Sequence, residues 1–97
     1  MIKSFEECKK EFIEKNTKEL NEALGQLKKS KETIDKNFRT HYWMEKYIEL
    51  CYQAQDIFLK RLRNQGFELS FPNKHYLKAR KNFENFETIE WTLDFKN

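Results

Sequence analysis

The residues of this chain best suited to catalysis or metal binding are two histidines and two cysteines. They are His41, His75, Cys8 and Cys51, and no two of them have a spacing typical of a metal site, such as CxxC, HxxxH or HExxH. Neither histidine has a nucleophile or an orienting acid at a readable spacing. Both cysteines lie on or beside apolar helical faces, where a thiol behaves as a small hydrophobic group. We therefore expect a non-enzymatic protein with no metal site, no cofactor and no catalytic residues.

Basic side chains next to aromatic rings offer a different chemistry. Residues 37–81 hold nine basic residues against four acidic ones, whereas residues 82–97 hold one against four. Basic groups can contact phosphates while rings stack on bases, although in a lysine-rich chain they also serve simply to keep the surface soluble. The pattern predicts, as an alternative function, a nucleic-acid-binding protein without sequence specificity. Its two clusters, at 60–63 and 74–81, contain Lys60, Arg61, Arg63, Lys74, Lys78, Arg80 and Lys81.

The element expected to position much of this surface is a helix at about 40–65. When it is wound at about 100° per residue, its apolar side chains fill an arc of roughly 200°, about twice the stripe of an ordinary surface helix. Thr40 is the expected N-cap and Gly66 the expected stop signal. Arg61 projects from the apolar arc, so we expect it either to extend along that surface or to reach a partner's anion. One neighbour cannot cover so wide an arc, and a second packed element or a second subunit is required.

A longer helix is expected before it, at about 4–36. Ser4 and Glu7 form a capping box, and apolar residues then keep one helical phase as far as Phe38. Residues 16–19 resemble a second capping box, which leaves open whether the helix breaks near 16–17. If it is continuous, its first turns overhang the shorter second helix. An overhang carrying Phe5, Phe12 and Ile13 favours an oligomer or a docking site for another protein.

After Gly66 the apolar period changes from 3.6 to 2. The alternation predicts a strand at about 67–71 and a second one at about 87–95. Between them, Asn73 and the spacing of Tyr76, Leu77, Arg80 and Phe83 predict a short helix at about 74–83. The outer edge of so small a sheet is a further candidate surface for pairing with another chain.

Together these elements predict one α+β domain over residues 1–97. Its fold is a long antiparallel helical hairpin followed by a small C-terminal strand–helix–strand unit packed on the second helix. The alternative is a helical bundle with a disordered tail, which the alternation at 89–95 disfavours. The absence of valine, with only two glycines and one proline, also favours long helices over a β-rich fold.

The function expected from these features is the binding of another protein. The candidate anchors are aromatic or arginine residues, the types favoured at interface centres, namely Tyr42, Trp43, Arg61, Tyr76 and Arg80. We expect a cytoplasmic regulator, inhibitor or adaptor that forms homodimers and does not enter a membrane, because the chain has neither an apolar leader nor a long apolar run. The abundance of Lys, Asn, Phe and Ile is typical of AT-rich genes, as in phages, other mobile elements and low-GC bacteria.

Overall fold

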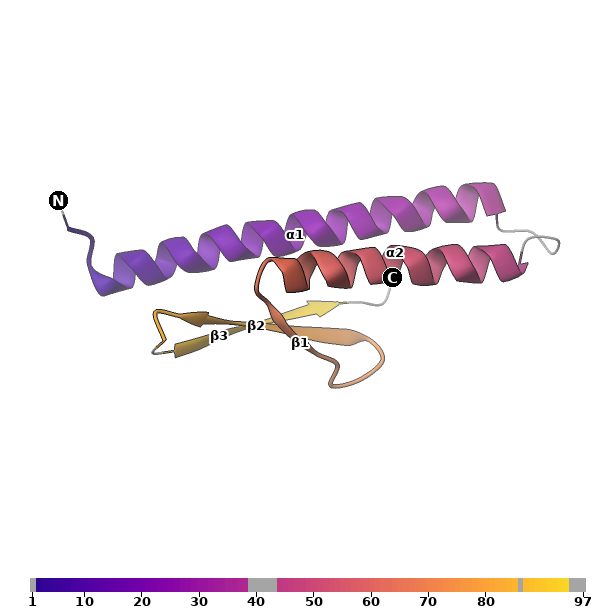
Figure 1. Ribbon diagram of the computed structural model, residues 1–97. Helices are drawn as coiled ribbons and strands as arrows, with labels where there is room; N and C mark the ends of the chain where they lie inside the picture. The colour runs from indigo at the N-terminus through magenta and orange to yellow at the C-terminus, as the bar shows by residue number, and fades with distance from the viewer. Residues whose placement is uncertain (1, 39–43, 86, 95–97) are drawn as a thin grey trace.

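The computed structural model describes residues 2–38, 44–85 and 87–94 and has two helices followed by a three-stranded sheet (Figure 1). Helix α1 spans Phe5–Phe38 and helix α2 spans Met44–Asn64. Strands β1, β2 and β3 span Glu68–Ser70, Tyr76–Phe83 and Glu87–Asp94. The predicted α+β class, the helical hairpin and the C-terminal strands are therefore confirmed.

Helix α1 is continuous through the segment where a break was an open alternative. It starts after Ser4, whose Oγ accepts a hydrogen bond from the backbone N–H of Glu7 at 3.2 Å. The polar pair in its middle, Asn16 and Thr17, does not cap a second helix, because both side chains bond to the sheet. Asn16 Oδ1 accepts from Lys81 Nζ at 2.9 Å, and Thr17 Oγ1 accepts from Trp91 Nε1 at 2.8 Å. The string that resembles a cap is thus a pair of tertiary contacts.

Helix α2 ends in a Schellman motif at Gly66, as the sequence predicts. Phe67 N–H donates to the carbonyl of Leu62 at 3.1 Å, and Gly66 N–H donates to that of Arg63 at 2.9 Å. Gly66 has a φ of 91°, a left-handed conformation that side chains with a Cβ rarely adopt. The predicted N-cap of α2, Thr40, lies outside the described residues. Asp56 and Lys60 form the predicted ion pair at 2.9 Å.

The chain's two glycines should respond in opposite ways to substitution by alanine. Gly25 faces solvent in the middle of α1, and an alanine Cβ there would have no atom within 4 Å. Gly25→Ala should therefore raise the free energy of unfolding by about 1 kcal/mol. Gly66→Ala should lower it by about 1–2 kcal/mol, because alanine is strained at that φ. Urea denaturation followed by helical circular dichroism measures both. Equal changes of the same sign in the free energy of unfolding would contradict the placement of Gly25 inside α1 and of Gly66 at the end of α2.

The predicted helix at 74–83 is wrong, because this segment is strand β2, the centre of an antiparallel meander in the order β1-β2-β3. Leu77 on β2 pairs with Leu93 on β3, and Ala79 on β2 pairs with Leu69 on β1. Asn73, the expected helix cap, instead closes the turn into β2: its Oδ1 accepts from the N–H groups of His75 and Tyr76 at 2.8 and 3.2 Å. An Asn side chain accepts the same backbone hydrogen bonds in such a turn as at the start of a helix. Its position in the sequence therefore does not distinguish a turn from a helix start.

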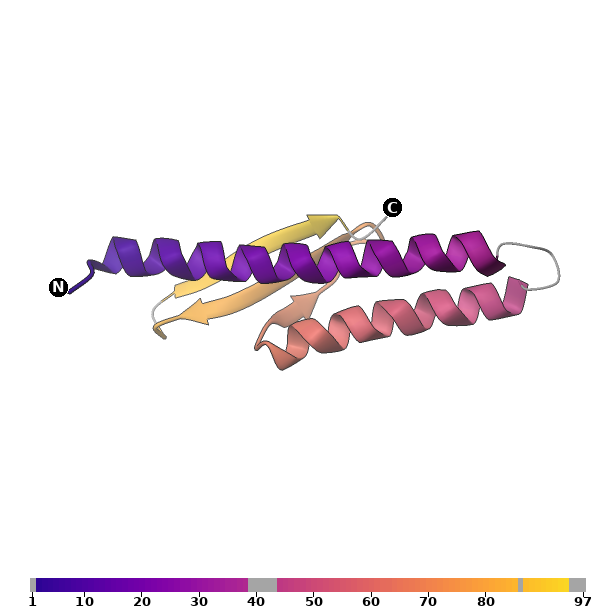
Figure 2. The same ribbon diagram turned by 90° about the horizontal axis from the view of Figure 1, so that it is seen from above.

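The sheet lies across both helices rather than on the second one alone. In Figures 1 and 2 it runs beneath the amino-terminal half of α1 and the end of α2. Phe12 stacks with Phe83 and Trp91 at ring-centroid distances of 5.1 and 6.4 Å, and Phe5 with Phe83 at 5.4 Å. The overhanging turns of α1, expected to need another subunit, are thus packed against the chain's own sheet. The core that joins the layers contains Leu20, Ala23, Leu27, Phe58, Leu62, Phe67, Leu77, Ala79 and Leu93.

Candidate functional site

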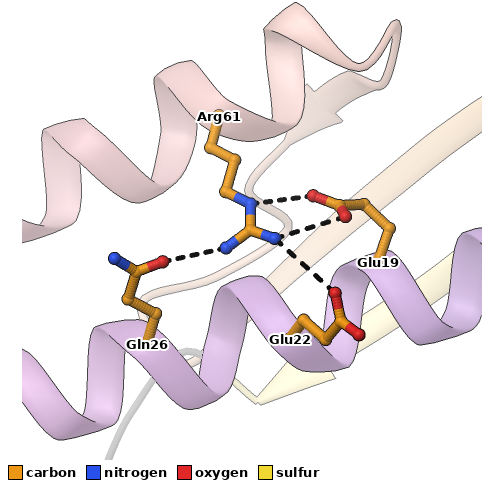
Figure 3. A network of polar contacts seen from close by, with 4 residues as sticks. All are labelled: Glu19, Glu22, Gln26 and Arg61. Carbon is orange, nitrogen blue, oxygen red and sulfur yellow. Dashed lines mark hydrogen bonds and ion pairs between the residues drawn. The ribbon is translucent and has the colours of Figure 1, made fainter.

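Arg61 is the centre of a polar network that joins the two helices (Figure 3). Its Nε and Nη2 donate to the two carboxylate oxygens of Glu19 at 2.8 and 3.2 Å, and its Nη1 donates to Gln26 Oε1 at 2.9 Å. Glu22 adds an ion pair at 3.9 Å. The hydrogen bond to Glu19 raises the pKa of the Arg61 guanidinium. The arginine that the sequence places on an apolar arc therefore bonds a carboxylate of its own chain, which the sequence pattern did not identify.

A groove of about 250 Å³ lies between the helices beside this network. Figure 3 shows the network on the near side of the hairpin with strands behind the helices, so the groove that Arg61 and Gln26 help to line is on the face away from the sheet. Its lining is mainly apolar or uncharged and comes from α1 (Ala23, Gln26, Leu27, Ser30, Ile34) and from α2 (Leu50, Gln53, Ala54, Ile57, Phe58, Arg61). The sequence does not predict this groove directly, although the wide apolar arc of α2 indicates that α1 alone cannot cover this helix.

That arc is covered most completely near the carboxyl terminus of α2, although Ile57 there is 64% exposed. Phe58 and Leu62 are buried by α1 and the sheet. Closer to the amino terminus, Met44, Ile48 and Tyr52 are 51, 46 and 68% exposed. They stand four residues apart and so form one row along the helix, called here the α2 row. The sheet therefore covers part of the arc, as expected, and leaves the α2 row open.

Tyr47 fastens the other side of this half of α2 to α1. Its hydroxyl donates to Asp35 Oδ1 at 2.5 Å, and this bond raises the pKa of Tyr47 to about 12. The α2 row is thus presented by a helix that is held at both ends, by Tyr47 and by Arg61. A helix held in this way presents its exposed side chains in a fixed geometry, which lowers the ordering cost of binding a partner.

The basic residues of the predicted second cluster lie on β2, where most of them have partners. Arg80 Nε and Lys78 Nζ lie 2.7 and 3.3 Å from the two carboxylate oxygens of Glu90 on β3. These contacts, Arg80's first, lower the pKa of Glu90. Tyr76, at the start of β2, is 43% exposed. The structure thus places Arg80 in a sheet-surface ion pair and not in a cluster with Arg61.

Lys81 points toward α1 instead of solvent. Its Nζ donates to Asn16 and lies 4.9 Å from the centre of the Phe67 ring, and burial lowers its pKa. Lys60 is paired to Asp56 and Arg61 to Glu19, so Arg63, Lys74 and Lys81 are the cluster members for which the described part of the chain shows no ion pair. This pairing weakens the nucleic-acid alternative, which stays a prediction.

Two of the five predicted partner anchors, Tyr42 and Trp43, lie outside the described residues. Of the three described anchors, Arg61 lies between the helices, whereas Tyr76 and Arg80 lie on β2. The α2 row and the groove are added as candidate surfaces. Within residues 2–38, 44–85 and 87–94, no three His, Cys, Asp or Glu side chains are grouped so that they could hold a metal ion, and Cys8 and Cys51 are free thiols. Neither described helix has the length and apolar character needed to span a membrane.

Comparisons with models of protein families, with curated proteins and with solved structures give no match for this chain. Its function must therefore be argued from its own surfaces.

Proposed function

We propose that this is a small non-enzymatic protein that acts as a regulator, inhibitor or adaptor by binding another protein through the α2 row. The exposure of Met44, Ile48 and Tyr52 in one line is the observation that supports this function. Burying apolar surface stabilises a complex by about 25 cal/mol per Å² before the costs of association. A row of three such side chains on a fixed helix gives a partner an apolar contact that needs little rearrangement.

The partner expected for this row is an amphipathic helix or another shallow apolar surface. Side chains at four-residue spacing form a ridge, and ridges pack between the side chains of a second helix. Tyr52 brings a large ring with a polar hydroxyl, a combination favoured at interface centres. Acidic residues beside the row alternate with basic ones, since Glu49 pairs with Lys46 and Asp56 with Lys60. This mixed polar surround favours a partner with polar residues of both charges beside its apolar ones.

Site-directed photo-crosslinking in the organism that encodes the chain tests this function. A photoreactive phenylalanine analogue at Tyr52 should form an adduct of defined mass with one protein. The same analogue at Lys28 is the control, because this side chain is also exposed but lies on α1, away from the four-residue spacing that forms the row. With the partner identified, Tyr52→Ala should weaken binding about tenfold or more. Adducts from position 28 but none from positions 44, 48 and 52 would refute the proposed surface.

A further inference from the structure

The groove between α1 and α2 is a second interaction surface, and we infer that it holds a second copy of this chain. In this dimer two hairpins pack groove to groove as a four-helix bundle, and each sheet stays on the outside. The surface is separate from the α2 row. Ile57 at the groove follows Ile48 by nine residues, which is two and a half turns, so the two side chains lie on opposite sides of the helix. The dimer is therefore independent of the proposed partner binding and leaves the α2 row of both copies free.

The first argument is the scarcity of charge in the groove. Arg61 is the only charged residue among the eleven that line it, whereas 35 of the chain's 97 residues (19 basic and 16 acidic) are charged. Three of the eleven (Ala23, Leu27 and Phe58) belong to the chain's own core, and at the chain's average about three of the other eight would be charged. The charge of Arg61 is balanced by the two-oxygen contact with Glu19. Loss of charged residues distinguishes the centre of a protein interface from ordinary surface.

The second argument is that one face carries both a projection and a hollow. Ile57 is 64% exposed although it borders the groove. A two-fold dimer is isologous, so the same patch must fit its own copy. When two such faces meet, the Ile57 side chain of each chain can enter the groove of the other. A second copy therefore buries the exposed isoleucine and fills the apolar groove in one contact.

The third argument is the arrangement of charges at the two ends of this face. Glu19 and Glu22 lie at the end near Arg61. Lys46 lies four residues before Leu50, near the other end, where its Nζ is 3.8 Å from Glu49. A two-fold axis across the hairpin reverses one copy relative to the other. Glu22 of each copy, which is less tightly held by Arg61 than Glu19 is, then lies toward Lys46 of the other copy, and this pairing favours the antiparallel arrangement.

The contact is short, which sets the concentration range of the test. The groove-lining part of α1 runs from Ala23 to Ile34, about 17 Å along the helix axis. An interface of this length is at the small end for specific complexes, so the dimer should dissociate on dilution. Sedimentation equilibrium of the full chain over about 1–500 μM should show the mass rising from 12.0 kDa toward twice that value.

Ile57→Glu should raise the dimer dissociation constant at least about tenfold, because it places a charge in the groove of the partner. Tyr52→Glu is the matched control: an exposed side chain of the same helix, outside the groove, whose substitution should leave the constant unchanged. Glu22→Lys should weaken the dimer, and adding Lys46→Glu should restore it. Circular dichroism should show all variants folded, since none of these positions is buried.

A chain that is monomeric at 500 μM overturns the inference. It is also overturned by a dimer that weakens with Tyr52→Glu and not with Ile57→Glu, or by a dimer that both leave unchanged. None of these results affects the crosslinking test of the α2 row, because that test reports adducts with a different protein. The two proposals can therefore fail separately.

Discussion

Replacing Leu62 by alanine should lower the free energy of unfolding by about 2–5 kcal/mol. Leu62 has no exposed surface and lies where α1, α2 and the sheet meet. Its carbonyl also accepts the Phe67 N–H that ends α2, so the surrounding backbone is held in place and cannot easily close the cavity. A domain of this size is stable by about 5–15 kcal/mol, so one such deletion removes a large share of its stability.

Ile48→Ala on the same helix is the matched comparison and should cost less than about 1 kcal/mol, because this side chain is already 46% exposed. Urea denaturation followed by helical circular dichroism and by tryptophan fluorescence measures both variants. The contrast tests whether the sheet covers only the carboxyl-terminal half of α2. Similar losses in the two variants would mean that the α2 row is buried in solution, which would remove the basis of the proposed function.

The helical hairpin and strand β3 could be predicted because each element keeps one apolar period over most of its length, although a break near 16–17 was left open. The apolar stripe of α1 keeps its phase over its 34 residues, and Gly66 supplies the backbone conformation that ends α2. In β3, Ile89, Trp91 and Leu93 alternate with polar residues over the full strand. Long runs of a single period are the most reliable features of a sequence.

Strand β2 could not be predicted because one of its inward positions holds a lysine. Leu77, Ala79 and Phe83 are buried at alternate positions, and Lys81 occupies the inward position between the last two. Without Lys81, the remaining large side chains at 77, 80 and 83 stand three residues apart and resemble one face of a helix. The acceptor that makes an inward lysine tolerable, Asn16, lies 65 residues earlier in the chain.

The candidate surfaces were predictable only in outline. The width of the apolar arc on α2 indicated that one neighbour could not cover it, and exposed residues on two sides of this helix agree with that argument. Which residues stay uncovered depends on how far the sheet extends beneath the hairpin, and no local pattern contains this. Arg61 was singled out correctly as unusual, but its partner Glu19 belongs to the other helix, 42 residues away.

Asn16→Leu should lower the free energy of unfolding by about 1–3 kcal/mol, because it removes the acceptor of a partly buried ammonium group. Asn16 is 4% exposed, and its Nδ2 also donates to the carbonyl of Phe12 at 2.8 Å, so the leucine must occupy a site shaped for an amide.

Adding Lys81→Met should recover most of the loss, since the buried charge is then gone and the methionine can pack against the Phe67 ring. Urea denaturation of the two single variants and the double variant gives the coupling between residues 16 and 81. Additive losses would show that the two side chains do not interact.

The same pair predicts how stability depends on pH. Burial lowers the pKa of Lys81 below its ordinary value of 10.5, so between the folded pKa and 10.5 the unfolded chain binds more protons than the folded one. Stability contributed through Lys81 therefore rises with pH across this window and is lowest below it, where the ammonium stays charged in the folded state. The Lys81→Met variant should lose this rise relative to the unchanged chain, and Asn16→Leu should enlarge it, because it leaves the charged form without its hydrogen bond. If the free energy of unfolding changed with alkaline pH equally in all three proteins, Lys81 would be exposed to solvent. The sheet would then not pack on α1 at this position.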